Sequence, residues 1–255
     1  MSGLGGFSSG GNATYLRVGI GKDEKGRDRA VIGKRAKEGD PGAVQVMFRE
    51  GEAAKDKDGN PVYRIEYGYI DGMITKIERE QAEFNGKTVD LLNLTFSTDQ
   101  GAYRLQLTRG DDYWIDFALR CKGIDWTKPV KITPYSIPQE NNPKFSNRLL
   151  VPSQGDEKIK RLFMLKWHKE EGAAPEPEPG TPPPYTYDHE EGAWKRKKTW
   201  NWLDQNCVQE AIDKVSFLNN AGATVDDEAH ATGIPASELE QAFGAVDNDP
   251  DSAPY

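Results

Sequence analysis

Apolar and polar residues alternate most strictly over residues 63–70, which predicts a strand in which one face carries Tyr63, Ile65, Tyr67 and Tyr69. The strand pattern continues to residue 77 across Gly72, and an internal glycine of this kind indicates a bulge or a sharp coil. The dipeptide Asn85-Gly86 is a strong hairpin signal, and it leads into further strands predicted over residues 89–97 and 103–108.

The pattern changes from alternation to helical spacing after Gly110. Asp111 and Asp112 are well placed to cap a helix start, and the apolar residues that follow at helical spacing are Trp114, Phe117, Ala118 and Cys121. We therefore predict a helix over residues 111–121. Strand-like sequence resumes after it, over residues 129–135, 149–151 and 159–167.

This order of elements matches a five-stranded Greek-key barrel of the oligonucleotide-binding (OB) type, in which a helix lies between strands 3 and 4. We expect a mainly β fold, with an OB barrel and an N-terminal extension over residues 15–170, after a disordered N-terminus at 1–14. Beyond the barrel we expect a Pro-rich linker (171–193), a small helical extension (194–245) and an acidic tail (246–255).

The net charge of −8 is distributed unevenly. Residues 1–200 carry 32 Lys and Arg against 30 Asp and Glu, whereas residues 201–255 carry one lysine against 11 acids. The acidity therefore belongs to the C-terminal part, and the remainder is close to neutral.

Signatures of catalysis are scarce in the sequence. The three histidines and two cysteines are scattered without metal-ligand spacing, and Gly19-x-Gly21 lacks the third glycine of a dinucleotide fingerprint. We expect a protein that is not an enzyme and needs no cofactor or metal. No apolar run approaches the roughly 20 residues of a membrane helix, and no signal peptide is recognisable, so the expected compartment is the cytoplasm.

An OB barrel binds single strands by stacking bases on aromatic rings while Lys and Arg follow the phosphates. The residues that we expect to contact nucleic acid on the barrel are Tyr67, Tyr69, Arg104, Arg109, Lys131, Tyr135, Lys144, Phe145 and Arg148. Tyr67 and Tyr69 could equally face the core. Arg104 should point away from it if Tyr103, Leu105 and Leu107 point inward.

The densest basic and aromatic cluster spans residues 194–202, where a nucleic-acid clamp would use Lys195, Arg196, Lys197, Lys198 and Trp200. The alternative interpretation is a solvated basic run ahead of a helix that packs Trp202 into a core. Residues 229–242 resemble a helix-turn-helix, but Glu238 and Glu240 would repel DNA, so we interpret them as a packing or protein-docking unit.

A barrel followed by a Pro-rich linker and an acidic end resembles the single-stranded DNA-binding proteins, particularly those of bacteriophages. Pro254-Tyr255 stands where bacterial members carry a terminal Pro-Phe. The resemblance implies sequence-independent single-strand binding in DNA replication or recombination, in the host cytoplasm if the protein is phage-encoded. It also implies recruitment of replication or recombination proteins through the tail residues Asp247, Asp249, Asp251, Pro254 and Tyr255, and it leaves homo-oligomers open.

Two other functions remain open from the sequence. The first is a non-catalytic protein-interaction or virion structural protein with a β-barrel domain. The second is a nucleic-acid-processing enzyme with an acidic metal site. Salt-sensitive, sequence-tolerant binding of single strands would support our leading interpretation, and no binding at low salt would contradict it. Metal-dependent loss of the substrate would favour the enzyme.

Overall fold

The computed structural model describes residues 13–22, 27–47, 52–56, 58–84, 87–139, 142–170 and 176–232. The chain divides into two units, Met1–Val215 and Ser216–Tyr255, and the sheets and the site described below belong to the first. Among the described residues, no helix is long and apolar enough to cross a membrane.

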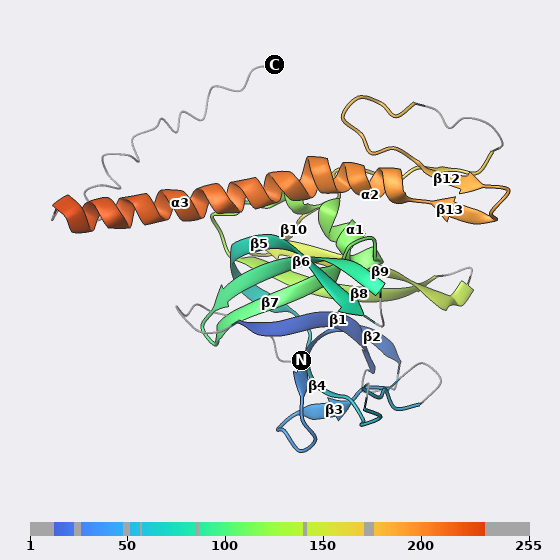
Figure 1. Cartoon of the computed structure of the whole chain (residues 1–255), viewed down its shortest axis with the longest axis horizontal. Coiled ribbons are helices and arrows are strands. Elements are labelled where there is room, and N and C mark those ends of the chain that lie inside the picture. The colour runs from blue at the N-terminus through green and yellow to red at the C-terminus, as the bar shows by residue number, and fades with distance from the viewer. Residues whose placement is uncertain are drawn as a thin grey trace. The chain divides into compact units, whose positions relative to one another are not determined.

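A ten-stranded sheet dominates the first unit, with the strand order β10-β9-β8-β5-β6-β7-β1-β2-β4-β3 (Figure 1). Its strands are β1 (Thr14–Lys22), β2 (Asp28–Ala36), β3 (Ala43–Gln45), β4 (Tyr63–Tyr67), β5 (Ile70–Phe84), β6 (Lys87–Thr98), β7 (Gly101–Thr108), β8 (Val130–Gln139), β9 (Asn142–Gln154) and β10 (Glu157–Lys158). The sheet is mixed, because β1 runs parallel to β7 while the other neighbouring strands of this sheet pair antiparallel.

The prediction of a five-stranded OB barrel is wrong. The segment from β5 to β9 does follow the predicted order of strands with a helix after β7. However, the edge of β7 pairs with β1, starting at Thr14 opposite Tyr103, and β2, β4 and β3 extend the sheet further. The region expected to be a mere N-terminal extension therefore supplies sheet strands, and the linear order ends at β10 and β3 instead of closing into a barrel.

The single long strand predicted over residues 63–77 is also two strands. β4 ends at Tyr67 and pairs with β2 and β3, whereas β5 begins at Ile70 and pairs with β6 and β8. Gly72 permits a close approach, since a β-carbon there would collide with the carbonyl oxygen of Ser97. The predicted irregularity is present nearby, as a register shift between Ile74 and Lys76.

The helix α1 (Asp112–Ala118) packs against β9 and β7, and the 3₁₀ turn η1 (Cys121–Gly123) follows it. Asp111 is the N-cap as predicted, because its carboxylate accepts the backbone N–H of Trp114 at 2.6 Å. Trp114 and Phe117 are buried with strand residues such as Phe96 and Leu105, so the core lies between the sheet and this helix.

A second, three-stranded sheet consists of β11 (Trp167–His168), β12 (Tyr185–Asp188) and β13 (Ala193–Lys195). The strand predicted over residues 159–167 is wrong, since within it only Trp167 belongs to a strand. β12 lies inside the predicted Pro-rich linker, and the domain boundary expected there stays a prediction.

The chain then continues as α2 (Lys197–Leu203), the π-helical turn η2 (Asp204–Val208) and α3 (Gln209–Thr232) (Figure 1). α2 and η2 both contact α1. The acidic tail and most of the helix-turn-helix-like segment lie outside the described residues.

Candidate nucleic-acid interface

One face of the large sheet carries a groove of about 740 Å³ whose lining comes from β1, β2, β4, β5, β6, β7 and the loops beside β3 and β4. Its aromatic and basic lining residues are Tyr15, Arg17, Arg35, Tyr63 and Arg64. We call this the tyrosine–arginine groove. It combines ring surfaces with guanidinium groups in a single concavity, which is the combination that single-strand binding requires.

The register of β1 against β7 places these side chains on the outer face of the sheet. Tyr15 pairs with Arg104 and Arg17 pairs with Gln106, and the Arg17 Nε donates to the Gln106 Oε1 at 3.2 Å. Leu16, between them, is fully buried on the opposite face, while Tyr15 is 51% exposed. Alternation along β1 thus separates the core from the groove.

Arg64 and Glu66 form an ion pair that lies mostly buried against the sheet. The Arg64 Nη2 is 2.7 Å from the Glu66 Oε1, and the side chains are only 14% and 12% exposed. The same guanidinium donates to the carbonyl oxygen of Ile20, and Glu66 also pairs with Arg29 at 3.2 Å. Arg64 is therefore fixed in place before any ligand arrives.

Three glycines provide the space for this pair. A β-carbon on Gly19 would lie 2.7 Å from the Arg64 Nη1, and one on Gly33 would lie 2.9 Å from the Arg64 Cδ. A β-carbon on Gly21 would lie 2.5 Å from the Glu66 Oε2. The Gly19-x-Gly21 motif thus has a steric function, since it lets charged side chains lie flat across β1.

Arg104 points away from the core as predicted, because Tyr103, Leu105 and Leu107 are buried. Its Nη1 donates to the Tyr15 hydroxyl at 3.2 Å, its guanidinium carbon lies 5.3 Å from the Tyr15 ring centroid, and its Nη2 pairs with Glu78 at 3.1 Å. Arg104 therefore supports Tyr15 from beside the groove. Its predicted contact with nucleic acid stays a prediction.

Other predicted residues lie half-buried and away from this groove's lining. Burial raises the pKa of Tyr67, and the Lys131 Nζ lies 4.0 Å from the Tyr69 ring centroid. Tyr135 has the Lys158 Nζ at 5.7 Å from its ring centroid. Arg148 lines a separate cavity of about 460 Å³ on which Arg64 and Glu66 also border. The side chains of Lys144 and Phe145 lie outside the described residues.

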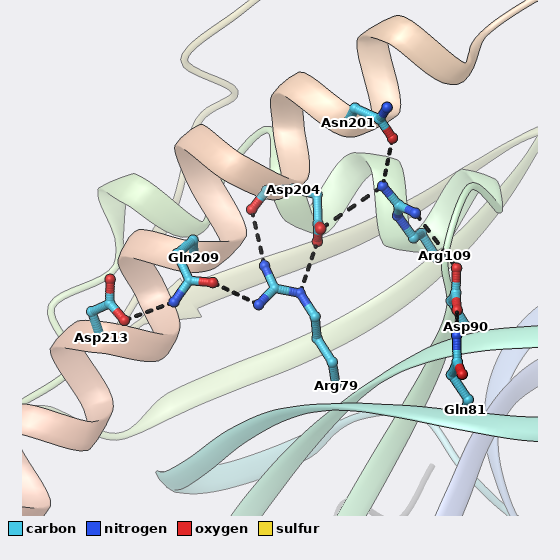
Figure 2. Close-up of polar contacts among 8 residues, drawn as sticks. All are labelled: Arg79, Gln81, Asp90, Arg109, Asn201, Asp204, Gln209 and Asp213. Carbon is cyan, nitrogen blue, oxygen red and sulfur yellow. Dashed lines mark hydrogen bonds and ion pairs between the residues drawn. The ribbon is translucent and has the colours of Figure 1, made fainter.

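Arg109 joins the sheet to the helical segment (Figure 2), and its predicted contact with nucleic acid stays a prediction. Its Nη2 donates to the Asn201 Oδ1 at 2.8 Å and lies 3.8 Å from Asp204, and its Nη1 lies 3.5 Å from Asp90. From β5, the Arg79 Nε donates to the same Asp204 carboxylate at 3.3 Å. The Asp204 carboxylate is therefore shared by Arg79 and Arg109, and it attaches the helical segment to the sheet.

The Arg79 side chain makes a further helix contact, since its Nη1 donates to the Gln209 Oε1 at 2.6 Å (Figure 2). The predicted residue Trp200 covers Gly110, where a β-carbon would lie 2.7 Å from its ring. Gly110 also has a φ of +85°, so both this backbone conformation and the close Trp200 ring require glycine at this position. These contacts give Arg109 and Trp200 structural roles.

The predicted basic run starts on the small sheet and enters α2. Lys195 pairs with Asp188 and, at 3.7 Å, with Glu191. The Arg196 guanidinium lies over the rings of Trp167 and Tyr185, at 5.6 Å and 5.5 Å from their centroids. Lys197 and Lys198 are exposed on the first turn of α2.

Sequence reasoning did not select the residues that line the groove. Tyr15 is absent from the predicted contacts, although the alternation Tyr15-Leu16-Arg17-Val18 already places Tyr15 and Arg17 on one face. No local sequence pattern indicates that Arg64 and Arg35 lie together, because their proximity depends on the pairing of β4 with β2.

The chemistry of the described residues gives no metal centre. Among them, no group of three or more His, Cys, Asp or Glu is placed to hold a metal ion. Cys121 and Cys207 are buried free thiols, and burial raises the pKa of both, to about 11 for Cys207. Comparison of the chain with protein-family models, with curated proteins and with solved structures found no match.

Proposed function

We propose that the protein binds single-stranded DNA without sequence specificity in the tyrosine–arginine groove, and that it acts by binding and protecting single strands in replication or recombination. The observation that supports this proposal best is the exposed Tyr15 ring beside Arg17 in a groove of about 740 Å³. A ring of this kind can stack an unpaired base at about 1–3 kcal/mol, whatever the base.

The arginines in the groove suit phosphate recognition. The Arg35 side chain is 79% exposed, and its Nη2 lies 3.7 Å from the Asp56 carboxylate, so the guanidinium can turn to a phosphate at little cost. Arg64 is held rigidly by Glu66 and Ile20, and so needs no ordering when a ligand binds. One mobile and one fixed guanidinium would follow a backbone while Tyr15 holds a base.

We propose binding and not catalysis because Asp56 and Glu80, the two carboxylates among the described residues that line the groove, have structural partners. The Glu80 Oε2 accepts a hydrogen bond from the Asn93 amide at 2.6 Å. The Asp56 Oδ1 accepts the backbone N–H groups of Asp58 and Asn60, both at 3.0 Å, and these bonds lower its pKa. Neither carboxylate is arranged as a general base.

Fluorescence anisotropy with a labelled oligo-dT strand tests the proposal. Tyr15→Ala should weaken binding about 5- to 150-fold, the equivalent of one lost stacking contact. Tyr15→Phe should retain most of the affinity, because it keeps the ring and loses only the hydroxyl that Arg104 contacts. Phe217→Ala, which removes a 70% exposed ring that does not line the groove, is the matched control and should bind as wild type.

Salt and competitor experiments complete the test. If Arg17, Arg35 and Arg64 contact three phosphates, the slope of log K against log salt concentration should be about −2. Single strands of any sequence should compete, whereas a blunt duplex should compete poorly because its bases are already stacked. Absence of binding at low salt, or equal affinities for wild type and Tyr15→Ala, would show that the proposal is wrong.

A further inference from the structure

The three-stranded sheet carries a row of aromatic rings that the groove does not include. Trp167 of β11 meets Tyr185 and Trp194 edge to face, with centroid distances of 4.7 Å and 4.9 Å. Tyr187 continues the row, at 5.2 Å from Trp194 and 5.1 Å from His189. We call these five residues the aromatic ladder.

A cation lies at each end of the aromatic ladder. The Arg196 guanidinium is within 5.6 Å of the Trp167 and Tyr185 ring centroids, and the Lys169 Nζ is 5.3 Å from the Tyr187 centroid. The carbonyl oxygen of Lys169 is also 2.7 Å from the His189 Nε2, which fixes this end of the row. Such cation–π contacts hold positive charge beside the rings.

Core packing explains only one end of the ladder. Tyr185 is 2% exposed, as a structural aromatic residue should be, but Trp167 beside it is 54% exposed. Tyr187 and Trp194 are half-buried. An edge-to-face row in which one of the two tryptophans is more than half exposed is a preformed surface for another flat group.

We propose that the aromatic ladder is a second contact site for single-stranded nucleic acid, at which unpaired bases stack on Trp167 while Arg196 and Lys169 contact phosphates. This inference rests on the proposed function for the class of ligand, but the residues of the aromatic ladder do not line the tyrosine–arginine groove. The cations favour a polyanion over a proline-rich peptide, which would also fit aromatic rings but carries no negative charge to pair with Arg196 and Lys169. Lys197 and Lys198, exposed after Arg196, add to the positive charge.

A second site has a measurable consequence for strand length. A strand long enough to occupy both sites gains affinity through effective concentration, whereas a short strand occupies one site at a time. Affinity should therefore rise steeply once the strand reaches both sites, and this rise should disappear when either site is removed.

Photocrosslinking of the full-length protein tests the proposal directly. Oligo-dT substituted with 5-iodouracil should crosslink to Trp167 or Trp194, as located by peptide mass spectrometry, because this probe reacts with aromatic rings that stack on the base. Recovery of crosslinks in the groove alone would overturn the second site while leaving the proposed function intact. Crosslinks to the ladder alone would overturn the groove and support the ladder.

Variants provide an independent measurement on the same strands. Trp167→Ala should weaken binding of a long oligo-dT by about 5- to 150-fold. Trp167→Leu, which keeps an apolar contact with Tyr185 and is the variant to use if alanine prevents folding, should weaken it similarly. Met164→Ala, at a 77% exposed position a few residues away, is the control and should have no effect.

An abasic strand of equal length separates stacking from charge. It should bind wild type and Trp167→Leu with equal affinity, since it has no base to stack. Unchanged affinity of Trp167→Leu for oligo-dT, or binding of a proline-rich peptide at Trp167 that oligo-dT does not displace, would show that the ladder is not a nucleic-acid site.

Discussion

The Nη1 atom of Arg64 lies 2.7 Å from the position that a β-carbon on Gly19 would take. Arg64 belongs to β4 and Gly19 to β1, with β2 between them in the sheet. The guanidinium therefore reaches across a whole strand, over Gly33, to bond the carbonyl oxygen of Ile20. The glycines of β1 and β2 thus leave the space in which the Arg64 guanidinium of β4 lies.

Gly33→Ala should displace Arg64 and destabilise the fold. The new β-carbon would lie 2.9 Å from the Arg64 Cδ, which is part of the side-chain stem and cannot withdraw without breaking the bonds to Glu66 and Ile20. We expect a loss of about 1–3 kcal/mol in the free energy of unfolding, as for other overpacked sites, measured by urea denaturation. Binding of single strands should weaken in the same variant.

A double-mutant cycle isolates the cause of this effect. In an Arg64→Ala background the space above Gly33 is empty, so Gly33→Ala should cost much less than in wild type. An equal cost in both backgrounds would mean that the backbone of β2, and not Arg64, requires glycine there.

Asp204→Ala should loosen the helical segment from the sheet. Its carboxylate is shared by Arg79 at 3.3 Å and Arg109 at 3.8 Å, and it lies in the π-helical turn, where the backbone pattern is already irregular (Figure 2). Removal leaves the half-buried Arg109 guanidinium and the more exposed Arg79 guanidinium without their common partner. We expect a loss of about 1 kcal/mol in the free energy of unfolding, because solvent screens the exposed member of the network.

Hydrogen exchange locates that loss. Amides of η2 and the first turn of α3 should exchange faster in Asp204→Ala, while amides of β5 and β6 keep their protection. Asp213→Ala is the matched control, because Asp213 accepts only the Gln209 amide in this network, at 2.7 Å, and contacts neither arginine. Uniformly faster exchange would contradict a local attachment role.

The local sequence pattern predicted where helices and strands lie better than it predicted which strands pair with each other. The helical spacing after Gly110 and the Asp111 cap located α1, and alternation oriented Arg104. The fold prediction failed because the parallel pairing of β1 with β7 joins Thr14 to Tyr103, and no local signal encodes a contact between residues so far apart in sequence. That pairing occupies the edge of β7 and extends the sheet through β1 towards β3.

The candidate site was hidden for the same reason. In the sequence Arg64 is one polar position of an alternating strand, and no local pattern connects it with Gly19 or Gly33. Only the pairing of β2 with both β1 and β4 brings the three together. The structural partners of Arg109 were hidden in the same way, since Asn201 and Asp204 come from a helical segment far along the chain.

Asp111 should make the stability of the protein depend on pH between about 4 and 6. Burial raises the pKa of this carboxyl from 3.8 to about 6, and the neighbouring Asp112 adds to the rise, although the bond from the Trp114 N–H opposes it. The folded state therefore binds this proton more tightly than the unfolded state does. Its stabilising contribution is complete below pH 4 and is lost as the pH rises through 6.

Asp111→Asn should remove this dependence, because asparagine is also a good N-cap and carries no charge. From pH 4 to pH 7.5, the wild type should lose up to about 3 kcal/mol more unfolding free energy than the variant, as a shift of roughly two pKa units requires. Urea denaturation at a series of pH values measures the difference. Asp156→Asn, at an exposed turn, should reproduce the wild-type profile. Parallel profiles for wild type and Asp111→Asn would mean that the carboxyl stays ionised despite its burial, with the helix N-terminus and the Trp114 N–H offsetting the cost of desolvation.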